Sequence, residues 1–390
     1  MSMRSLLTTR SLIAFTLLAS VVPNHETSRP TYATSPQTNR AQLFSAARAG
    51  GDYLVRMQKH DGSFHYSYDA AADQVESRTY NIVRHAGTAM SLFDLYGATR
   101  EPRYRASARL AVRFLKTRFH RARGKNAVYL LDYDGKAKLG ANGLALVAFA
   151  RQIELDPKRA DRQSASRLAN LILAMQREDG SFETRYRLRP DDPEGIESLY
   201  YPGEAILGLV RLYKLNGDRR LLESARRGAD FLIISQRRME VLPPDAWLMQ
   251  ALEALYTIGR EGKYAAHAIA LAEAMMAEQY TDNDPPGYAG GFPPAPPRST
   301  PAAARAEGMV SAYRIARSTG DARASKIAHA LKACATFQLK QQFTGRNSAS
   351  LQNPRRAAGG FFEGPGLLRI RIDFVQHNIS SLLAIGEALK

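Results

Sequence analysis

Four carboxylates in this sequence are placed so that two of them could act as a general acid and a general base. Each lies near the expected start of a different helix: they are Glu204, Asp245, Glu307 and Asp373. Two carboxyl groups, one protonated and one ionised, can hydrolyse a glycosidic bond. The sequence does not select one pair. These carboxylates also have structural interpretations. Glu204 and Asp245 are typical of a helix start, where Asp245 would be the N-cap, and Glu307 could form an ion pair with Arg305.

Two histidines offer proton transfer near neutral pH. His377 follows Asp373 by four residues, one helical turn, so the carboxylate could orient the imidazole as a general base. His85 lies in the polar segment 80–88, directly after Arg84. The alternative for both is a buried, hydrogen-bonded histidine, with Asp373 serving as a helix cap.

Side chains suited to bind a sugar accompany these groups. An arginine can clamp a carboxylate through two hydrogen bonds, an aromatic face can stack on a sugar ring, and an amide can bond a sugar hydroxyl. The candidates of these three kinds are Arg84, Arg305 and Arg371, then Tyr201 and Trp247, and lastly Asn142. The alternatives are ion pairs with nearby acids for the arginines, core packing for Trp247, and a bond to a neighbouring helix for Asn142.

The sequence predicts no metal site and no cofactor. Cys334 is the only cysteine, which excludes an intramolecular disulfide and a zinc site built from several thiolates. Segments 132–134 and 282–284 begin like calcium loops, but neither continues with the expected terminal glutamate.

Composition indicates a folded chain with a bias toward anionic partners. The 390 residues are 45% apolar and 23% charged, with 18 Tyr and 15 Phe, which argues against disorder. The formal net charge of +17 favours an anionic partner but does not choose among nucleic acid, acidic polysaccharide and a membrane surface.

The N-terminal end has the pattern of a signal peptide. Arg4 and Arg10 precede an apolar run over residues 12–22, which Pro23 and a polar stretch follow. The run is about half of the roughly 20 residues that span a bilayer. We therefore expect residues 1–33 to be a signal peptide and leader, and residues 34–390 to be one exported domain, periplasmic or secreted. Export makes nucleic acid an improbable partner, and no later segment is apolar enough for a stable membrane span.

The positions of these candidates follow from a repeating pattern of helices. Twelve helices are expected near residues 42–57, 87–97, 102–118, 140–153, 162–176, 203–214, 219–236, 246–258, 262–279, 304–317, 322–340 and 375–388. The odd members are charged on one face, whereas the even members are nearly apolar all round and must be buried on most sides. Six outer and six inner helices in alternation specify an all-α protein, an (α/α)6 barrel.

The connections between these helices fall into two sets. Turns from an inner helix to the next outer helix are short and contain glycine, as in residues 213–218 and 318–321. Most connections from an outer to an inner helix run to about 20 to 33 residues, and long structured loops are usually functional. They would all emerge on one rim, above the N-termini of the inner helices, so we expect the site there.

Two long loops carry one phrase, Gln-x-x-Asp-Gly-Ser-Phe, at residues 58–64 and 176–182. An Asp-Gly turn followed by alternating aromatic residues predicts a short β-hairpin over the rim. With these repeats the chain resembles the α/α-toroid superfamily, which includes six-hairpin glycosidases, N-acylglucosamine 2-epimerase-like proteins, polysaccharide lyases and terpenoid cyclases. The cyclases' Asp-x-Asp-Asp motif is absent, so we interpret the repeated phrase as a structural clasp.

Three functions remain compatible with that resemblance. The first is a glycoside hydrolase with paired carboxylates on the rim. The second is an epimerase or lyase acting on a uronate or amino sugar, with histidine moving a proton and arginine neutralising the substrate carboxylate. The third is a noncatalytic protein that binds envelope polysaccharide. In each, the expected partner is a polysaccharide or oligosaccharide, including an anionic one.

Overall fold

The computed structural model describes residues 39–76, 79–123, 126–159, 161–189, 192 and 197–389. All of them belong to the compact unit Tyr32–Lys390. The expected signal peptide, residues 1–33, lies outside the described residues.

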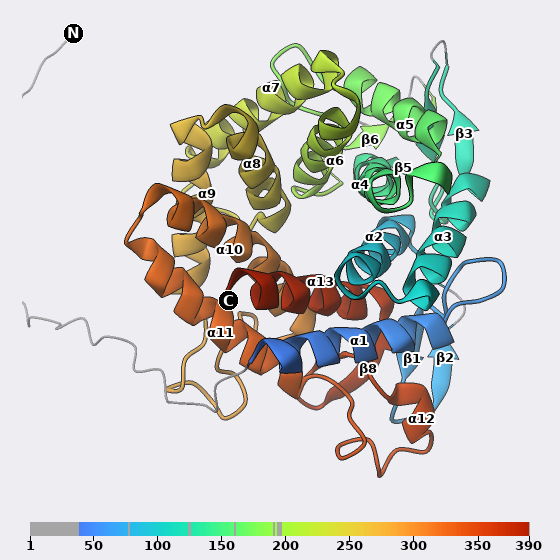
Figure 1. The fold of residues 1–390 in the computed structure, drawn as a ribbon, viewed down its shortest axis with the longest axis vertical. Helices are drawn as coiled ribbons and strands as arrows, with labels where there is room; N and C mark the ends of the chain where they lie inside the picture. Colours follow the sequence, from blue (N-terminus) through green and yellow to red (C-terminus); the bar gives the residue numbers. More distant parts are fainter. Residues whose placement is uncertain are drawn as a thin grey trace, which may run out of the picture. The chain divides into compact units, whose positions relative to one another are not determined.

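Helices form two concentric rings (Figure 1). The outer ring consists of α1 (Arg40–Arg56), α3 (Pro102–Thr117), α5 (Arg162–Ala174), α7 (Arg219–Gln236), α9 (Gly262–Ala277) and α11 (Arg323–Lys340). The inner ring consists of α2 (Ile82–Thr99), α4 (Leu139–Leu155), α6 (Tyr201–Asn216), α8 (Ala246–Gly259), α10 (Ser299–Thr319) and α13 (Ile372–Ala388). Each inner helix packs on the next, and α13 packs on α2, so the ring is closed. The predicted (α/α)6 barrel is confirmed.

The two rings differ in the way the sequence predicted. In α4 almost every residue is buried, whereas α3 buries a single stripe that includes Tyr104, Ala108 and Leu115. Burial of these apolar faces supplies most of the favourable free energy of folding, at roughly 25 cal/mol per Å². Two inner helices begin five residues earlier than expected, α2 at Ile82 and α10 at Ser299. For α2 the reason is a cap, because Asn81 accepts a hydrogen bond from the backbone N–H of Arg84.

Glycines in the N-terminal halves of inner helices let neighbouring helices approach closely. A Cβ atom placed on Gly143 of α4 would lie 2.8 Å from the backbone nitrogen of Ala205 in α6. A Cβ on Gly203 of α6 would lie 2.6 Å from the backbone nitrogen of Leu248 in α8. Only glycine permits such close contact.

Short strands lie in the connections that lead into inner helices. The largest sheet has the order β2-β1-β8-β7 and is formed by β1 (Ser67–Asp69), β2 (Gln74–Glu76), β7 (Phe362–Gly364) and β8 (Leu367–Arg371). The strands β1 and β8 are antiparallel with Ser67 opposite Arg371, so the first and last connections are joined beside α1 (Figure 1). The pairs β3 (Phe119–Arg121) with β4 (Val128–Leu130), and β5 (Ala137–Lys138) with β6 (Arg185–Tyr186), complete the strands. Of two one-turn helices, η1 (Pro157–Arg159) lies between α4 and α5, and α12 (Pro354–Ala357) precedes β7 in the connection from α11 to α13.

The repeated Gln-x-x-Asp-Gly-Ser-Phe phrase forms a clasp between neighbouring outer helices. The Gln176 side-chain amide donates to the carbonyl oxygens of Gly180, 3.0 Å, and Ser224 in α7, 2.9 Å. Gln58 makes the same pair of bonds to Gly62 and to Ser107 in α3. The structural interpretation of the phrase is therefore supported by its contacts.

Two further clasps lack the full phrase. Gln279 donates to Gly290 and to Ala330 in α11, and Gln342 donates to Gly359 and to Ala46 in α1. The last of these ties the end of the outer ring to its beginning. The hairpin expected at residues 58–68 is smaller than predicted. Gln58 and Phe64 form an isolated bridge, and the paired strands begin only at Ser67.

Candidate active site inside the barrel

His377 and Glu307 meet inside the inner ring. The Nδ1 atom of His377, in the second turn of α13, lies 3.1 Å from Oε1 of Glu307 in α10. Both side chains are largely withdrawn from solvent, with 13% of His377 and 5% of Glu307 exposed. The ring of Trp247, at the start of α8, lies 6.0 Å from the imidazole, centre to centre. Three inner helices thus contribute to one acid–base group.

Asp373 lies one helical turn before His377 and is held by two arginines. Arg371 donates to both of its carboxylate oxygens, at 2.6 and 2.9 Å, and Nε of Arg84 lies 3.2 Å from Oδ2. Arg84 also donates to the hydroxyl of Tyr66. Arg84 keeps 38% of its side chain exposed, so this cation remains open to a ligand.

The electrostatic environments of Glu307 and Asp373 shift the pKa values of these two carboxyl groups in opposite directions. Burial raises the pKa of Glu307 above its ordinary value, although the adjacent imidazole opposes the shift. Burial would also raise the pKa of Asp373, but Arg371 and Arg84 outweigh it and hold that pKa below its ordinary value. Burial would lower the pKa of His377, yet the Glu307 and Asp373 carboxylates raise it overall. The pair of His377 and Glu307 therefore retains a proton readily, while Asp373 stays ionised.

Glu204 and Asp245 form a second pair of proton-holding carboxyls. Burial and the nearby Asp245 raise the pKa of Glu204 to about 8, and burial raises that of Asp245 to about 7. Asp245 caps α8, accepting from the backbone N–H of Leu248 at 3.0 Å, and it also accepts from the Gln236 amide of α7. Both of its oxygens are thus taken by protein groups. Glu204 instead leaves a buried oxygen, Oε2, without a hydrogen-bond partner among the described residues.

Tyr201, in the first turn of α6, lies beside Glu204. A Cβ on Gly140 of α4 would fall 2.3 Å from Glu204 Oε2 and from Cδ1 of the Tyr201 ring, so both side chains pack against that glycine. Burial and the Glu204 carboxylate raise the pKa of Tyr201 to about 12, so its hydroxyl stays protonated and able to donate.

His85 is placed outside this group. It is fully buried between α2 and α3, where Nε2 contacts the carbonyl oxygen of Ala111 at 2.9 Å and Nδ1 contacts the Tyr80 hydroxyl at 2.7 Å. Burial lowers its pKa to about 4, so it is neutral at physiological pH. These contacts match the interpretation of His85 as a hydrogen-bonded core residue.

Asn142 and Arg305 are likewise engaged with the protein. The Asn142 amide accepts from the backbone N–H of Leu130 and donates to the carbonyl of Lys138, which fixes the strand and loop before α4. Arg305 lies 3.4 Å from Glu278 at the end of α9 and over the ring of Phe292, so it faces the outer ring. The contacts of both favour the structural alternatives.

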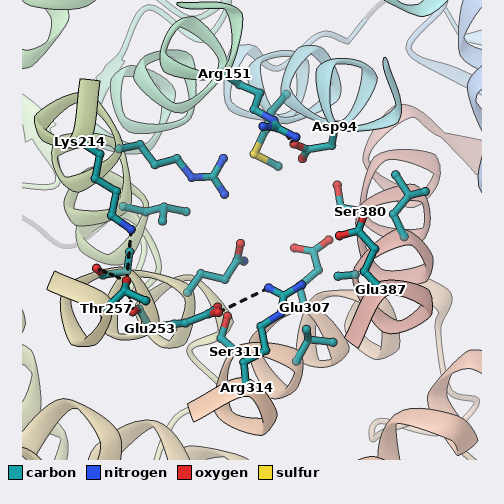
Figure 2. Close-up of a pocket in the computed structure, with 18 residues that line it drawn as sticks. Asp94, Arg151, Lys214, Glu253, Thr257, Glu307, Ser311, Arg314, Ser380 and Glu387 are labelled. Atoms are coloured by element: carbon teal, nitrogen blue, oxygen red, sulfur yellow. Dashed lines mark hydrogen bonds and ion pairs between the residues drawn. The ribbon is translucent and has the colours of Figure 1, made fainter. Parts of the chain in front are cut away.

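A cavity of about 330 Å³ opens among the C-terminal halves of the inner helices, at the end of the barrel away from the long loops. Figure 2 shows charged side chains from all sides of the ring pointing into it. Its cations are Arg151, Arg211, Lys214 and Arg314, and its carboxylates are Asp94, Glu253, Glu307 and Glu387. Glu307 is the one candidate from the sequence that lines it.

This cavity lies at the end of the barrel opposite the long-loop rim, where the sequence led us to expect the site. Glycines bring the N-terminal halves of the inner helices close together, as at Gly203 and Gly308, where an added Cβ would lie within 2.8 Å of the backbone of α8. The C-terminal halves instead carry long polar side chains, which do not pack densely across the axis. Sequence analysis missed Arg211 and Gln250 of this cavity. Both are polar residues within a largely apolar helix, as Asn142 is, and that pattern could have identified them.

Within the described residues no cluster of three or more His, Cys, Asp and Glu side chains could hold a metal ion. No helix of the described part is both long and apolar enough to cross a bilayer.

The chain is similar to solved structures of a mannanase, a sugar epimerase and a sugar isomerase. A GH76 α-1,6-mannanase from Salegentibacter is 13% identical, with a TM-score of 0.64, over 89% of this chain and 100% of that one. The cellobiose 2-epimerase of Bacillus thermoamylovorans is 13% identical, with a TM-score of 0.66, over 89% of this chain and 98% of that one. A D-mannose isomerase is 12% identical, with a TM-score of 0.65, over 90% and 96%.

No family model and no curated protein matches the sequence. The similarity therefore shows the fold class alone, an (α/α)6 barrel, as the sequence predicted. Members of that class in the solved structures include glycoside hydrolases, a sugar epimerase and a sugar isomerase.

Proposed function

We propose that this protein is a carbohydrate-active enzyme that epimerises or isomerises a sugar by proton transfer at His377 and Glu307. The observation that carries the proposal is the 3.1 Å contact of these two side chains inside the barrel. A histidine paired with a carboxyl group can accept a proton and return it, which hydrolysis by two carboxylates does not require. The fold is shared with a cellobiose 2-epimerase and a D-mannose isomerase, which supports the proposal.

The residues divide the work as follows. His377 takes a proton from the carbon next to the carbonyl group of an open-chain sugar, which leaves an enediolate. The imidazolium then returns the proton to the neighbouring carbon, which isomerises the sugar, or to the other face of the same carbon after the intermediate has turned that face toward it, which epimerises the sugar. Glu307, on Nδ1, holds the ring so that Nε2 faces the substrate, and stabilises the imidazolium while it lasts. Arg84 neutralises the oxygen on which negative charge develops, because its side chain is the more exposed of the two arginines on Asp373. Trp247 offers an apolar wall beside the imidazole.

A glycoside hydrolase is the second candidate, and the opposed pKa shifts of Glu307 and Asp373 favour it. Groups whose environments push their pKa values apart make natural acid and base partners. The contacts of Asp373 weigh against this, because arginines occupy both of its oxygens. The mannanase structures include a variant made inactive at two consecutive aspartates. The only consecutive aspartates here are Asp191 and Asp192, and Asp192 accepts hydrogen bonds from the backbone of residues 188 and 189.

Products formed in D2O distinguish these activities. We would incubate the protein with cellobiose, D-mannose and α-1,6-mannotriose, and follow the reactions by NMR and by an assay for reducing ends. Epimerisation or isomerisation predicts deuterium at the carbon next to the carbonyl, with no gain in reducing ends. New reducing ends without deuterium would establish the hydrolase instead. Binding without any product would favour the noncatalytic alternative.

Matched variants tie the activity to the site. Substitutions His377→Gln and Glu307→Gln should each lower kcat by about 10² or more, the usual contribution of a positioned acid or base. The control is His120→Gln, because His120 is an exposed residue of β3 that stacks on Tyr129. Full activity in His377→Gln would contradict the proposal.

We also propose that the protein is exported. The support is the basic and apolar pattern of residues 1–33. Mass spectrometry of the protein recovered from the cell envelope or medium should show an N-terminus near residue 34. An intact N-terminus on protein found only inside the cell would contradict export.

A further inference from the structure

The cavity at the short-loop end contains a cation without a counter-ion. Arg211, in the last two turns of α6, lines the cavity and makes no ion pair or hydrogen bond with any described residue. Burial lowers its pKa, while nearby Asp94 and Glu253 only partly offset that cost. Withdrawing a guanidinium from water without a partner is expensive, so the cavity is prepared for an anion.

Lys214, one turn further along α6, adds a second available charge. Among the described residues, its ammonium group has one hydrogen-bond partner, the hydroxyl of Thr257 at 3.2 Å (Figure 2). Arg211 and Lys214 therefore offer two positive charges to the same space.

The carboxylates of the cavity do not cancel these charges, because most of them already have partners. Asp94 accepts from Arg151 at 2.8 Å, and Glu253 lies 3.6 Å from Arg314. Glu307 pairs with His377. Glu387 is the exception: it has no partner among the described residues, but it is exposed at the end of α13.

Hydroxyl and amide groups line the rest of the cavity. Ser380 of α13 has a buried hydroxyl oxygen with no hydrogen-bond partner in the described protein. Ser311 of α10 and Gln250 of α8 face the same space. Such neutral groups suit the hydroxyls of a sugar, and the volume of about 330 Å³ lies at the small end of ligand pockets.

We propose that this cavity binds a small anionic sugar, either a sugar acid or a sugar phosphate. Its carboxylate or phosphate pairs with Arg211 and Lys214, and its hydroxyls bond Ser380, Ser311 and Gln250. The residues that line the cavity include Glu307 but not Asp373 or its two arginines. Binding at this cavity goes beyond the proposed activity, because it does not depend on turnover at His377.

Calorimetric titration of the protein with four probes tests the proposal. The probes are D-glucuronate, glucose 6-phosphate, inorganic phosphate and glucose. We expect at least one of the two sugar anions to bind at least tenfold more tightly than glucose, and more tightly than inorganic phosphate. The preference between them separates carboxylate from phosphate recognition. Glucose binding as tightly as both sugar anions, or absence of binding by either of them, would overturn the proposal.

Variants locate the binding. Arg211→Gln and Lys214→Gln should each weaken binding of the preferred sugar anion about tenfold or more, because each removes a charge-assisted contact. Arg219→Gln is the matched control, since Arg219 is an exposed arginine at the start of α7 with no ion pair in the described chain. Lys214 is exposed, so its variant should fold even if Arg211→Gln does not. Unchanged affinity in Lys214→Gln and Arg211→Gln would place the ligand elsewhere and refute the assignment.

Discussion

His377 of α13 and Glu307 of α10 are separated by 70 residues in the sequence, yet their side chains lie 3.1 Å apart within the barrel. The contact exists because α10 and α13 are neighbours in the inner ring. It joins two groups that the sequence had suggested separately, a histidine one turn after Asp373 and a glutamate two residues after Arg305. The closed ring thus converts separate helix-start motifs into one acid–base pair.

The first prediction concerns the charge on His377. Glu307→Gln should lower the pKa of His377, because the Glu307 carboxylate is the largest influence that raises it against burial. Titration of the imidazole carbon-bound protons by NMR measures this directly. The signals of the exposed His120 serve as the internal reference in both proteins. An unchanged His377 titration would mean that the two side chains do not interact in solution.

The second prediction concerns stability and the buried carboxyl of Glu204. Its pKa rises from 4.5 in an open chain to about 8 in the folded protein, so the folded state binds the extra proton between these values. The free energy of unfolding should therefore fall as pH rises through this window, by at most about 1.4 kcal/mol per pH unit from this one group. Glu204→Gln has no proton to lose and should flatten the decline.

Urea denaturation at several pH values between 5 and 8 would measure this slope. Glu240→Gln is the control, because Glu240 is exposed in the connection between α7 and α8. Equal slopes in wild type and Glu204→Gln would show that Glu204 ionises without cost in the fold.

The third prediction concerns Asp373 as a positioning residue. Asp373→Asn should lower the pKa of His377, since the Asp373 charge also raises it, and should free Arg371 from its two bonds. Activity should fall while the pH profile shifts toward lower pH. Comparison of kcat and KM across pH measures both effects. A lower kcat with an unmoved pH profile would indicate a purely structural role for this carboxylate.

The sequence sufficed for the fold because helix burial is a periodic property. Alternation of one-sided helices with nearly apolar ones predicted the two rings, and Gly217 and Gly320, both with positive φ, end inner helices as expected. The sequence did not suffice for the site, because a polar residue at a helix start can face the axis or the outer ring. Glu307 and Arg305 are two residues apart, yet one meets His377 and the other meets Glu278.

Hydrogen-bond partners were equally hidden from the sequence. His85 and His377 both begin inner helices, but His85 turns toward the backbone of α3 and His377 toward α10. The direction depends on the angular position of each residue around its helix, where successive residues differ by about 100°, and on how the packed helix is rotated about its own axis. Only the packed structure resolves such a choice.

The last prediction concerns the clasps that join the outer helices. Gly180 has φ +92°, and a Cβ there would lie 2.6 Å from the carbonyl oxygen of Arg227. Gly180→Ala should therefore cost both the left-handed strain and a backbone clash, and lower the free energy of unfolding by more than about 2 kcal/mol. Gly217→Ala is the matched control: Gly217 also has positive φ, +71°, but no atom lies within 4 Å of its added Cβ. It should lose only about 1 kcal/mol, the strain alone.

Gln176→Ala complements the glycine pair, because it removes both hydrogen bonds that the Gln176 amide donates in the same clasp, together with the one that its Oε1 accepts from Arg227, without straining the backbone. A loss of about 1 to 3 kcal/mol is expected, since the carbonyls of Gly180 and Ser224 each lose a donor. Urea denaturation of the three variants would rank them. Equal losses in Gly180→Ala and Gly217→Ala would mean that the clasp yields without cost, and that its close contact does not hold α5 and α7 together.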